Sequence, residues 1–146
     1  VDCEAIVDQV VESYQDEIQE QGIVIVTSVE QTGPVFSDAP RLRLILTDLL
    51  KNAIQFRDIN KVVTTIEISI VTSIDNWTIC VTDNGIGIDP LQQEKVFNLF
   101  YRGSEKSTGS GIGLYIIQEA IDKMEGTIKL ESTPGIGSTF EITLPN

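Results

Sequence analysis

The sequence predicts an α+β two-layer sandwich, a mixed and mostly antiparallel sheet with helices on one face. Three observations support this fold class. Apolar residues recur at helical spacing in three long segments. Short alternating segments lie between them, and four of these form two adjacent pairs joined by turn residues. Adjacent strands joined by short turns are antiparallel neighbours, so most of the sheet should be antiparallel.

The first half of the chain predicts helix, strand and helix. Residues 1–21 have apolar side chains every three or four positions, which predicts a helix, and a strand is expected at 23–29. Asp38 is expected to cap a second helix, with Pro40 in its first turn. This helix should extend to about Phe56, with a stripe of leucines facing the core.

A hairpin and a short helix are expected next. Two alternating strands at 65–72 and 77–82 are joined by the turn residues 73–76. Asp89 and the proline after it should start a short helix that reaches about Phe97.

The last third predicts a loop, a helix and a closing hairpin. Residues 98–110 are polar and are interpreted as a mobile loop. An amphipathic helix is expected at 112–124. Strands at 127–132 and 138–144 should then pair around the turn 134–137.

Length and composition predict one globular domain over residues 1–146. Hydrophobic residues make up 41% and charged residues 22%, which suits a folded core and not a disordered chain. No apolar segment approaches the roughly 18 residues that a membrane helix needs. The first residue is Val1 and the only methionine is Met124. We therefore expect the chain to be part of a longer protein.

Charge and residue types exclude several functions. The chain has no histidine, so histidine bases, histidine zinc ligands and Ser-His-Asp catalysis are excluded. A net charge of -12 argues against nucleic acid as a partner. It also conflicts with triphosphate binding, but Lys95, Arg102 and Lys106 cluster locally, and a divalent metal can add positive charge.

One helix carries oxygen donors on a single side. Asp48, Asn52 and Gln55 follow one another at intervals of one turn. A solvated polar face accounts for this pattern on an isolated helix. The functional alternative is an Mg²⁺ site, because this ion takes few protein ligands and completes its shell with water and phosphate oxygens.

Two glycine clusters are open to more than one interpretation. Asp83-Asn84-Gly85 is either a hairpin turn or the end of a strand that presents a carboxylate to a base amine. Gly109-Ser110-Gly111-Ile112-Gly113 opens a helix, where backbone amides can meet phosphate, although it is neither a Walker loop nor a Rossmann loop. A third Gly-Ile-Gly, at 135–137, is expected to be a hairpin turn.

Together these segments resemble the N, G1, F and G2 boxes of the catalytic, ATP-binding domain of sensor histidine kinases, in that family's order. The similarity covers essentially the whole chain. The matching segments are DLLKNAIQF at 48–56, DNGIGI at 83–88, VFNLFYRG at 96–103, GSGIGL at 109–114 and GSTFEITLP at 137–145.

The resemblance implies a Bergerat-type ATP-binding fold with ATP and Mg²⁺ as ligands. It implies that Asn52 ligates Mg²⁺, that Asp83 binds the adenine amino group, and that residues 98–110 form an ATP lid. The other implied site residues are Asp48 beside Asn52, Arg102 near the terminal phosphate, Gly85 and Gly87 at the base, Thr139 supporting the adenine through water, and Lys106, Gly109, Gly111, Gly113 and Leu114 around the phosphates.

Two positions depart from the family pattern. Relatives usually carry Asn, or Glu in the related ATPases, where this chain has Asp48. They usually carry Lys where this chain has Gln55, so one phosphate-facing cation is missing. Arg57 or Lys106 is a candidate to compensate, and slow catalysis is the alternative.

The resemblance therefore predicts a protein-histidine kinase domain of a two-component system. The implied partners are a histidine-bearing dimerisation domain of the parent protein and a downstream response regulator. Neither nucleic acid nor membrane contact is expected of this domain, which should be cytoplasmic even if the parent is membrane-anchored. Two alternatives stay open: a nucleotide-binding module without phosphotransfer, and a stand-alone serine kinase or ATP-driven clamp of the same superfamily.

Overall fold

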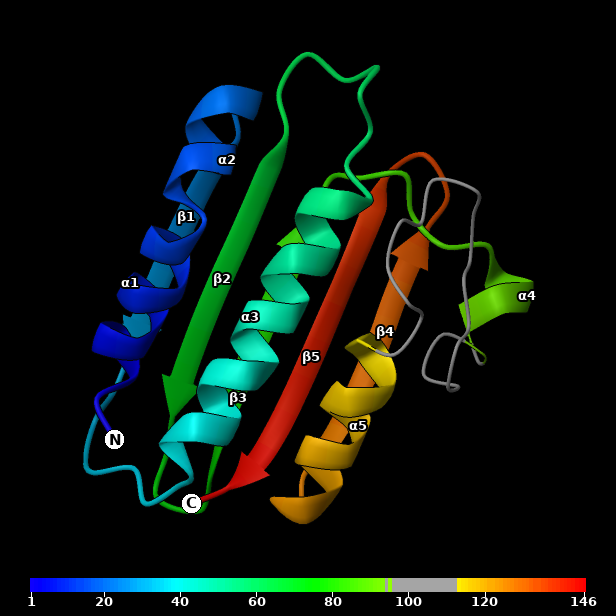
Figure 1. Cartoon of the computed structure of the whole chain (residues 1–146). Helices are drawn as coiled ribbons and strands as arrows, with labels where there is room; N and C mark the ends of the chain where they lie inside the picture. Colours follow the sequence, from blue (N-terminus) through cyan, green and yellow to red (C-terminus); the bar gives the residue numbers. More distant parts are fainter. Residues whose placement is uncertain (94, 96–112) are drawn as a thin grey trace.

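The computed structural model describes residues 1–93, 95 and 113–146. These residues form two layers, a sheet and a set of helices that cover one of its faces (Figure 1). The strands are β1 (Val24–Glu30), β2 (Thr65–Thr72), β3 (Asn76–Asp83), β4 (Thr127–Thr133) and β5 (Gly137–Pro145). The helices are α1 (Cys3–Ser13), α2 (Gln15–Gln21), α3 (Ala39–Gln55), α4 (Pro90–Gln93) and α5 (Gly113–Lys123).

The sheet is mixed, as the sequence predicts. Its strand order is β1-β2-β3-β5-β4. β1 and β2 are parallel and are connected through α3, whereas the other neighbouring pairs are antiparallel. A parallel pair needs a crossover long enough to return to the same end of the sheet, and α3 provides it. The predicted fold class is confirmed.

The core lies between the sheet and the helices. In β2 the buried side chains alternate with exposed ones, because successive strand residues point to opposite faces. β3 and β5 alternate in the same way, with Trp77 and Phe140 among the largest buried side chains. The apolar stripe of α3 faces the sheet and consists of Leu42, Ile45, Leu46, Leu49, Leu50, Ala53 and Ile54.

The first predicted helix is interrupted, which the helical periodicity did not indicate. Residue Tyr14 has φ -108° and ψ 13°, and its amide donates to the carbonyl of Val11. The hydroxyl of Ser13 donates to the carbonyl of Val10 at 2.6 Å. Such hydroxyl bonds to the preceding turn compete with helix geometry, so α1 ends and α2 begins here.

Two hydrogen bonds fix the position of α3, and the first confirms the predicted cap at Asp38. The side chain of Asp38 accepts from the amide of Arg41 at 3.1 Å, which caps the first turn. At the other end, the carbonyl of Phe56 accepts from the amide of Ile86 at 3.1 Å. The C-terminal turn of α3 therefore contacts the segment that follows β3.

Candidate nucleotide site

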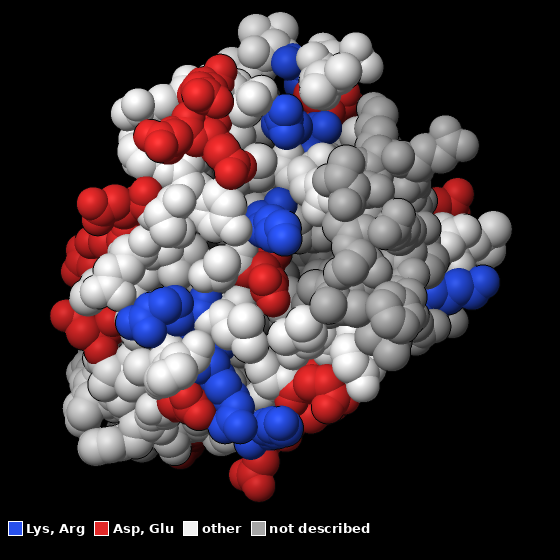
Figure 2. Space-filling model, viewed as in Figure 1, with Lys and Arg blue, Asp and Glu red and all other residues white. Residues whose placement is uncertain are grey.

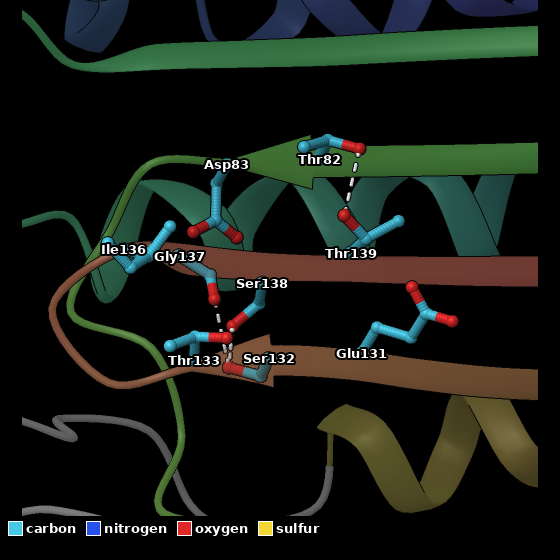
Figure 3. Close-up of a pocket in the computed structure, with 9 residues that line it drawn as sticks. All are labelled: Thr82, Asp83, Glu131, Ser132, Thr133, Ile136, Gly137, Ser138 and Thr139. Atoms are coloured by element: carbon cyan, nitrogen blue, oxygen red, sulfur yellow. Dashed lines mark hydrogen bonds between the residues drawn. The ribbon is translucent and has the colours of Figure 1, made fainter.

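A hollow of about 240 Å³ opens at one end of the sheet, where β3 ends and the β4–β5 hairpin turns (Figure 3). Seven of its nine lining residues carry a hydroxyl or carboxyl group, so it can offer several hydrogen bonds to a ligand. The lining residues are Thr82, Asp83, Glu131, Ser132, Thr133, Ile136, Gly137, Ser138 and Thr139.

Asp83 is the last residue of β3, and its carboxyl group lies next to Gly137 and Ser138 in this hollow (Figure 3). Its Oδ1 accepts from the amide of Gly85 at 2.8 Å. The backbone amide of Ser138 also donates to this carboxyl group. Burial raises the pKa of Asp83 above the usual aspartate value, and these two hydrogen bonds and the charge of Lys61 oppose the rise. The carboxylate is thus held as a half-buried acceptor.

Ser138, and not Thr139, is the β5 residue beside Asp83. In the antiparallel register Ser138 lies opposite Asp83, and Thr139 lies opposite Thr82. Successive side chains alternate between faces, so Asp83 and Ser138 share the helix-covered face. The hydroxyl of Thr139 lies on the other face, 3.2 Å from that of Thr82. The structure thus places Ser138, and not Thr139, beside the Asp83 carboxyl group.

Ser132 is a second residue that the sequence reasoning missed. Its hydroxyl accepts from the amide of Ile88 at 2.7 Å and lies 2.8 Å from the hydroxyl of Ser138. It also donates to the carbonyl of Gly137 at 3.0 Å. Alternation along β5, counted back from the buried Phe140, could have placed Ser138 on the helix-covered face. Ser132 follows only from the strand register, which pairs it with Ser138.

The glycines of the first and third Gly-Ile-Gly allow backbone segments to meet. A Cβ atom at Gly85 would lie 2.9 Å from Oδ1 of Asp83 and 3.3 Å from the carbonyl carbon of Phe56. Gly137 has φ 144°, and a Cβ atom there would collide with the carbonyl oxygen of Asp83. A Cβ atom at Gly87 would likewise collide with the backbone of Thr133. Apart from the carboxyl oxygen of Asp83, these atoms belong to the protein's own backbone, so the glycines allow backbone segments to approach one another beside the hollow.

Replacing Gly137 with alanine should destabilise the fold and distort the hollow. The backbone conformation at φ 144° is essentially reserved for glycine and costs other residues about 1–3 kcal/mol, to which the collision with Asp83 adds. Urea unfolding measures the loss. Gly33→Ala is the matched control, because no atom lies within 4 Å of its Cβ position and its φ is not positive. That control should be neutral or slightly stabilising; equal stability of the two variants would contradict the role of Gly137.

The Asp83-Asn84-Gly85 segment is not a type I′ turn. That turn needs positive φ at both central residues, and neither Asn84 nor Gly85 has it. Instead the side chain of Asn84 accepts from the amide of Thr65 at 2.9 Å and donates to the carbonyl of Val63 at 2.8 Å. Asn84 thus anchors the segment to the start of β2, which leaves Asp83 at the strand end.

The polar face of α3 reaches the same end of the molecule. The carbonyl of Asn52 accepts from the amide of Phe56, whose own carbonyl accepts from Ile86 beyond β3. Asp48 lies one turn earlier and is half-buried. Burial raises the pKa of Asp48, and the charge of Lys51 opposes that rise. Asn52 is also partly buried, so the polar face of α3 is not fully solvated.

These oxygen donors fit Mg²⁺. No group of three or more His, Cys, Asp or Glu side chains that could hold a metal ion occurs within residues 1–93, 95 and 113–146. Mg²⁺ does not need one, because it keeps several waters and is bound through one or two carboxylates together with substrate phosphates. Asp48 and Asn52 offer one carboxylate and one amide oxygen at adjacent turns of α3.

Arg57 does not take the place of the missing lysine at position 55. Its guanidinium group donates to the carbonyl of Ile54 at 2.8 Å and to the side chain of Gln21 in α2 at 3.1 Å. α2 lies over β1, at the edge of the sheet that is opposite to the hollow (Figure 1). Arg57 therefore joins α3 to α2.

Part of the predicted phosphate site lies outside the described residues: the 98–110 lid, Arg102, Lys106, Gly109 and Gly111. Of the remaining candidates, Gly113 begins α5. Leu114 packs partly buried against the core, which indicates a structural contribution.

Positive charge is present along α3 and the loop after it although the chain is acidic. No lysine or arginine precedes Arg41 in the sequence. Figure 2 shows Lys and Arg side chains along the length of the helical face, with acidic side chains between them and at the left. The basic residues of α3 and the loop after it are Arg41, Arg43, Lys51, Arg57 and Lys61. The net charge of -12 is thus compatible with an anionic ligand at this face.

Comparison with known families and curated proteins gives one consistent result. The model of the histidine kinase-, DNA gyrase B- and HSP90-like ATPases matches residues 37–146. The sensor-like histidine kinase SenX3 of Mycobacterium tuberculosis is 36% identical over 149 residues, which cover 99% of this chain and 36% of the relative. The phytochrome-like protein Cph1 of Synechocystis is 34% identical over 146 residues, which cover 99% of this chain and 19% of the relative. The chain thus spans about a third or less of these proteins.

Solved structures show the same fold. Full-length ShkA in complex with AMPPNP superposes with a TM-score of 0.86 at 26% identity, covering 99% of this chain and 30% of ShkA. The catalytic domain of the histidine kinase ThkA gives a TM-score of 0.85 at 23% identity, covering 99% of this chain and 93% of that domain. Within the described residues, no helix has the length and apolar character needed to cross a membrane.

Proposed function

Because the chain belongs to the histidine kinase-, DNA gyrase B- and HSP90-like ATPase family, as a catalytic and ATP-binding domain of the sensor histidine kinase type, we propose that it binds Mg·ATP and transfers the γ-phosphate to a histidine. That histidine belongs to a separate dimerisation domain of the same parent protein. A response regulator then receives the phosphoryl group. We propose a cytoplasmic location for this domain.

The observation that carries the proposal is the half-buried carboxyl group of Asp83, which lines the hollow. Two backbone amides orient it, from Gly85 and Ser138. An ionised carboxylate only accepts hydrogen bonds, so it matches the amino group of adenine. We assign Ser138 to the support of the base, in place of Thr139, because its buried hydroxyl shares the face of Asp83.

The phosphates extend from this base site toward α3. Asn52 and Asp48 present oxygen atoms there, and a bound Mg²⁺ would neutralise charge on the transferring phosphoryl group. Phosphoryl transfer needs little covalent chemistry from the protein. The residues of this chain therefore act mainly by orienting the nucleotide so that the γ-phosphate is in line with the incoming imidazole. Arg102, Lys106 and the glycines at 109–113 are proposed to complete the phosphate site.

Transfer to a histidine-bearing partner tests the proposal. The 146-residue chain is incubated with γ-labelled ATP, magnesium and the helices that carry the acceptor histidine in the parent protein. We expect acid-labile label on that partner and no histidine label on this chain, because the chain contains no histidine. A partner with its histidine replaced by glutamine is the control and should stay unlabelled.

Two other results would redirect the assignment. ATP binding without transfer to any acceptor would support a nucleotide-binding module, which the glutamine at position 55 favours because a cation is missing there. Acid-stable label on serine would support a serine kinase of the same superfamily.

A further inference from the structure

The loop between α3 and β2 places one lysine at the junction of two segments beside the hollow. The Nζ of Lys61 donates to the carbonyl oxygen of Asn84 at 2.6 Å, of Ile136 at 2.9 Å and of Gly85 at 3.3 Å. An ammonium group has three donors, and here each has an acceptor. Lys61 is therefore held in one place, unlike a freely solvated surface lysine.

These three carbonyls belong to two segments at the edge of the hollow, which Asp83 and Ile136 line. Asn84 and Gly85 directly follow Asp83, and Ile136 lies in the turn between β4 and β5. The amide of Gly135 also donates to the carbonyl of Ile86 at 2.8 Å, which joins the same segments beside Lys61. Charge-assisted hydrogen bonds are stronger than neutral ones, so the ammonium group is the stronger link of the two.

Lys61 also acts on Asp83 through its charge. Its field lowers the pKa of Asp83, against the rise that burial causes. Lys61 and Asp83 do not form an ion pair: among the described residues the one salt bridge is that between Arg41 and Asp38. Lys61 can thus favour the ionised carboxylate without occupying the oxygens that a ligand would use.

We propose that Lys61 is a positioning residue for base recognition: its ammonium group ties the segment after Asp83 to the β4–β5 turn and so holds the Asp83 carboxylate where the base binds. The inference rests on the proposed function, since it assumes that Asp83 receives the base. Attraction of phosphate by Lys61 is the competing role. Three bonds to backbone carbonyls leave this ammonium without a further donor for phosphate.

Adenosine and ATP distinguish the two roles, because adenosine has the base but no phosphate. Lys61→Met keeps most of the side-chain length and removes the donors. We expect it to weaken both ligands by the same factor, on the order of tenfold, in titrations followed by amide chemical shifts. Lys123→Met is the matched control: it removes the same charge from an exposed position in the last turn of α5 and should change neither affinity. A loss confined to ATP and abolished by added salt would overturn the proposal.

A second readout is the pH dependence of adenosine binding. Binding should be lost as the pH falls through the pKa of Asp83, because the protonated carboxyl group no longer accepts as an anion. Lys61→Met removes a charge that lowers this pKa, so its binding should fail at a higher pH than in the unmodified chain. Lys61→Arg keeps the charge and should keep the wild-type midpoint. Its rigid planar fork cannot reproduce three bonds from one atom, so its affinity for adenosine and ATP should still fall equally. An unshifted midpoint in Lys61→Met would contradict the inference.

Asp83→Asn separates this inference from the proposed function. If that variant keeps the nucleotide preference of the unmodified chain, Asp83 does not read the base and the proposed site is wrong. If Asp83→Asn changes the preference while Lys61→Met binds adenosine normally, the site stands and only the role of Lys61 is overturned.

Discussion

Replacing Asp83 with asparagine should remove the preference for ATP over GTP. In the unmodified chain we expect ATP and ADP to bind at least tenfold more tightly than GTP. Guanine presents a carbonyl where adenine has an amino group, and an unpaired buried acceptor costs about 1–3 kcal/mol. The asparagine amide presents a donor, which repels the adenine amine and accommodates the guanine carbonyl. Calorimetric titration with both nucleotides measures the change; equal affinity for ATP and GTP in the unmodified chain would remove Asp83 from this role.

Stability measurements show whether the lost nucleotide preference of an Asp83 variant reflects a local change or unfolding. Burial raises the pKa of Asp83 in the folded state, so the folded protein holds its proton at a pH where the unfolded chain has released it. The ionised carboxylate therefore costs stability above the folded pKa, and this cost disappears as the pH falls through that pKa. Asp83→Asn removes this cost but keeps only one acceptor oxygen for the amides of Gly85 and Ser138, so we expect its stability at pH 7 to be close to that of the unmodified chain. Asp83→Ala lacks that acceptor, and we expect it to bind neither nucleotide well.

Replacing Asn52 with alanine should abolish phosphotransfer while the fold stays intact. Asn52 is partly buried but lies outside the apolar stripe of α3, so its truncation leaves no cavity in the core and should cost about 1 kcal/mol or less of stability. Loss of a metal ligand removes charge neutralisation at the transferring group, which is worth several kcal/mol, or at least about a hundredfold in rate. Labelling of the histidine-bearing partner at saturating ATP and varied magnesium measures the effect.

Arg43→Ala provides the control on the same helix. Arg43 is exposed, lies more than two turns from Asn52 and donates to the side chain of Gln9 in α1 at 3.1 Å. Its removal should leave the transfer rate unchanged. Wild-type transfer by Asn52→Ala at every magnesium concentration would place the metal elsewhere and refute the proposed role of α3.

Much of the fold could be predicted from local pattern. The helix over 39–55 follows from its apolar stripe and its Asp38 cap, and both depend on residues within a few positions of each other. The hairpin of β2 and β3 follows from alternation around a short turn. The alternating strand over 77–82 indicated that Asp83 lies at the end of a strand, which the structure confirms. The break at Tyr14 was not predictable from periodicity, because both halves keep apolar residues on the same face.

What the sequence determined by itself is therefore the order of the elements, the residues that face the core and the motifs that identify the family, since these depend on neighbours along the chain. Only the tertiary structure decided which side chains surround Asp83. The register between β3 and β5 selects Ser138 over Thr139, and the return of the β4–β5 turn brings Ile136 to Lys61, 75 positions earlier. Such contacts depend on how distant strands align, and a shift of one residue would turn every side chain to the other face.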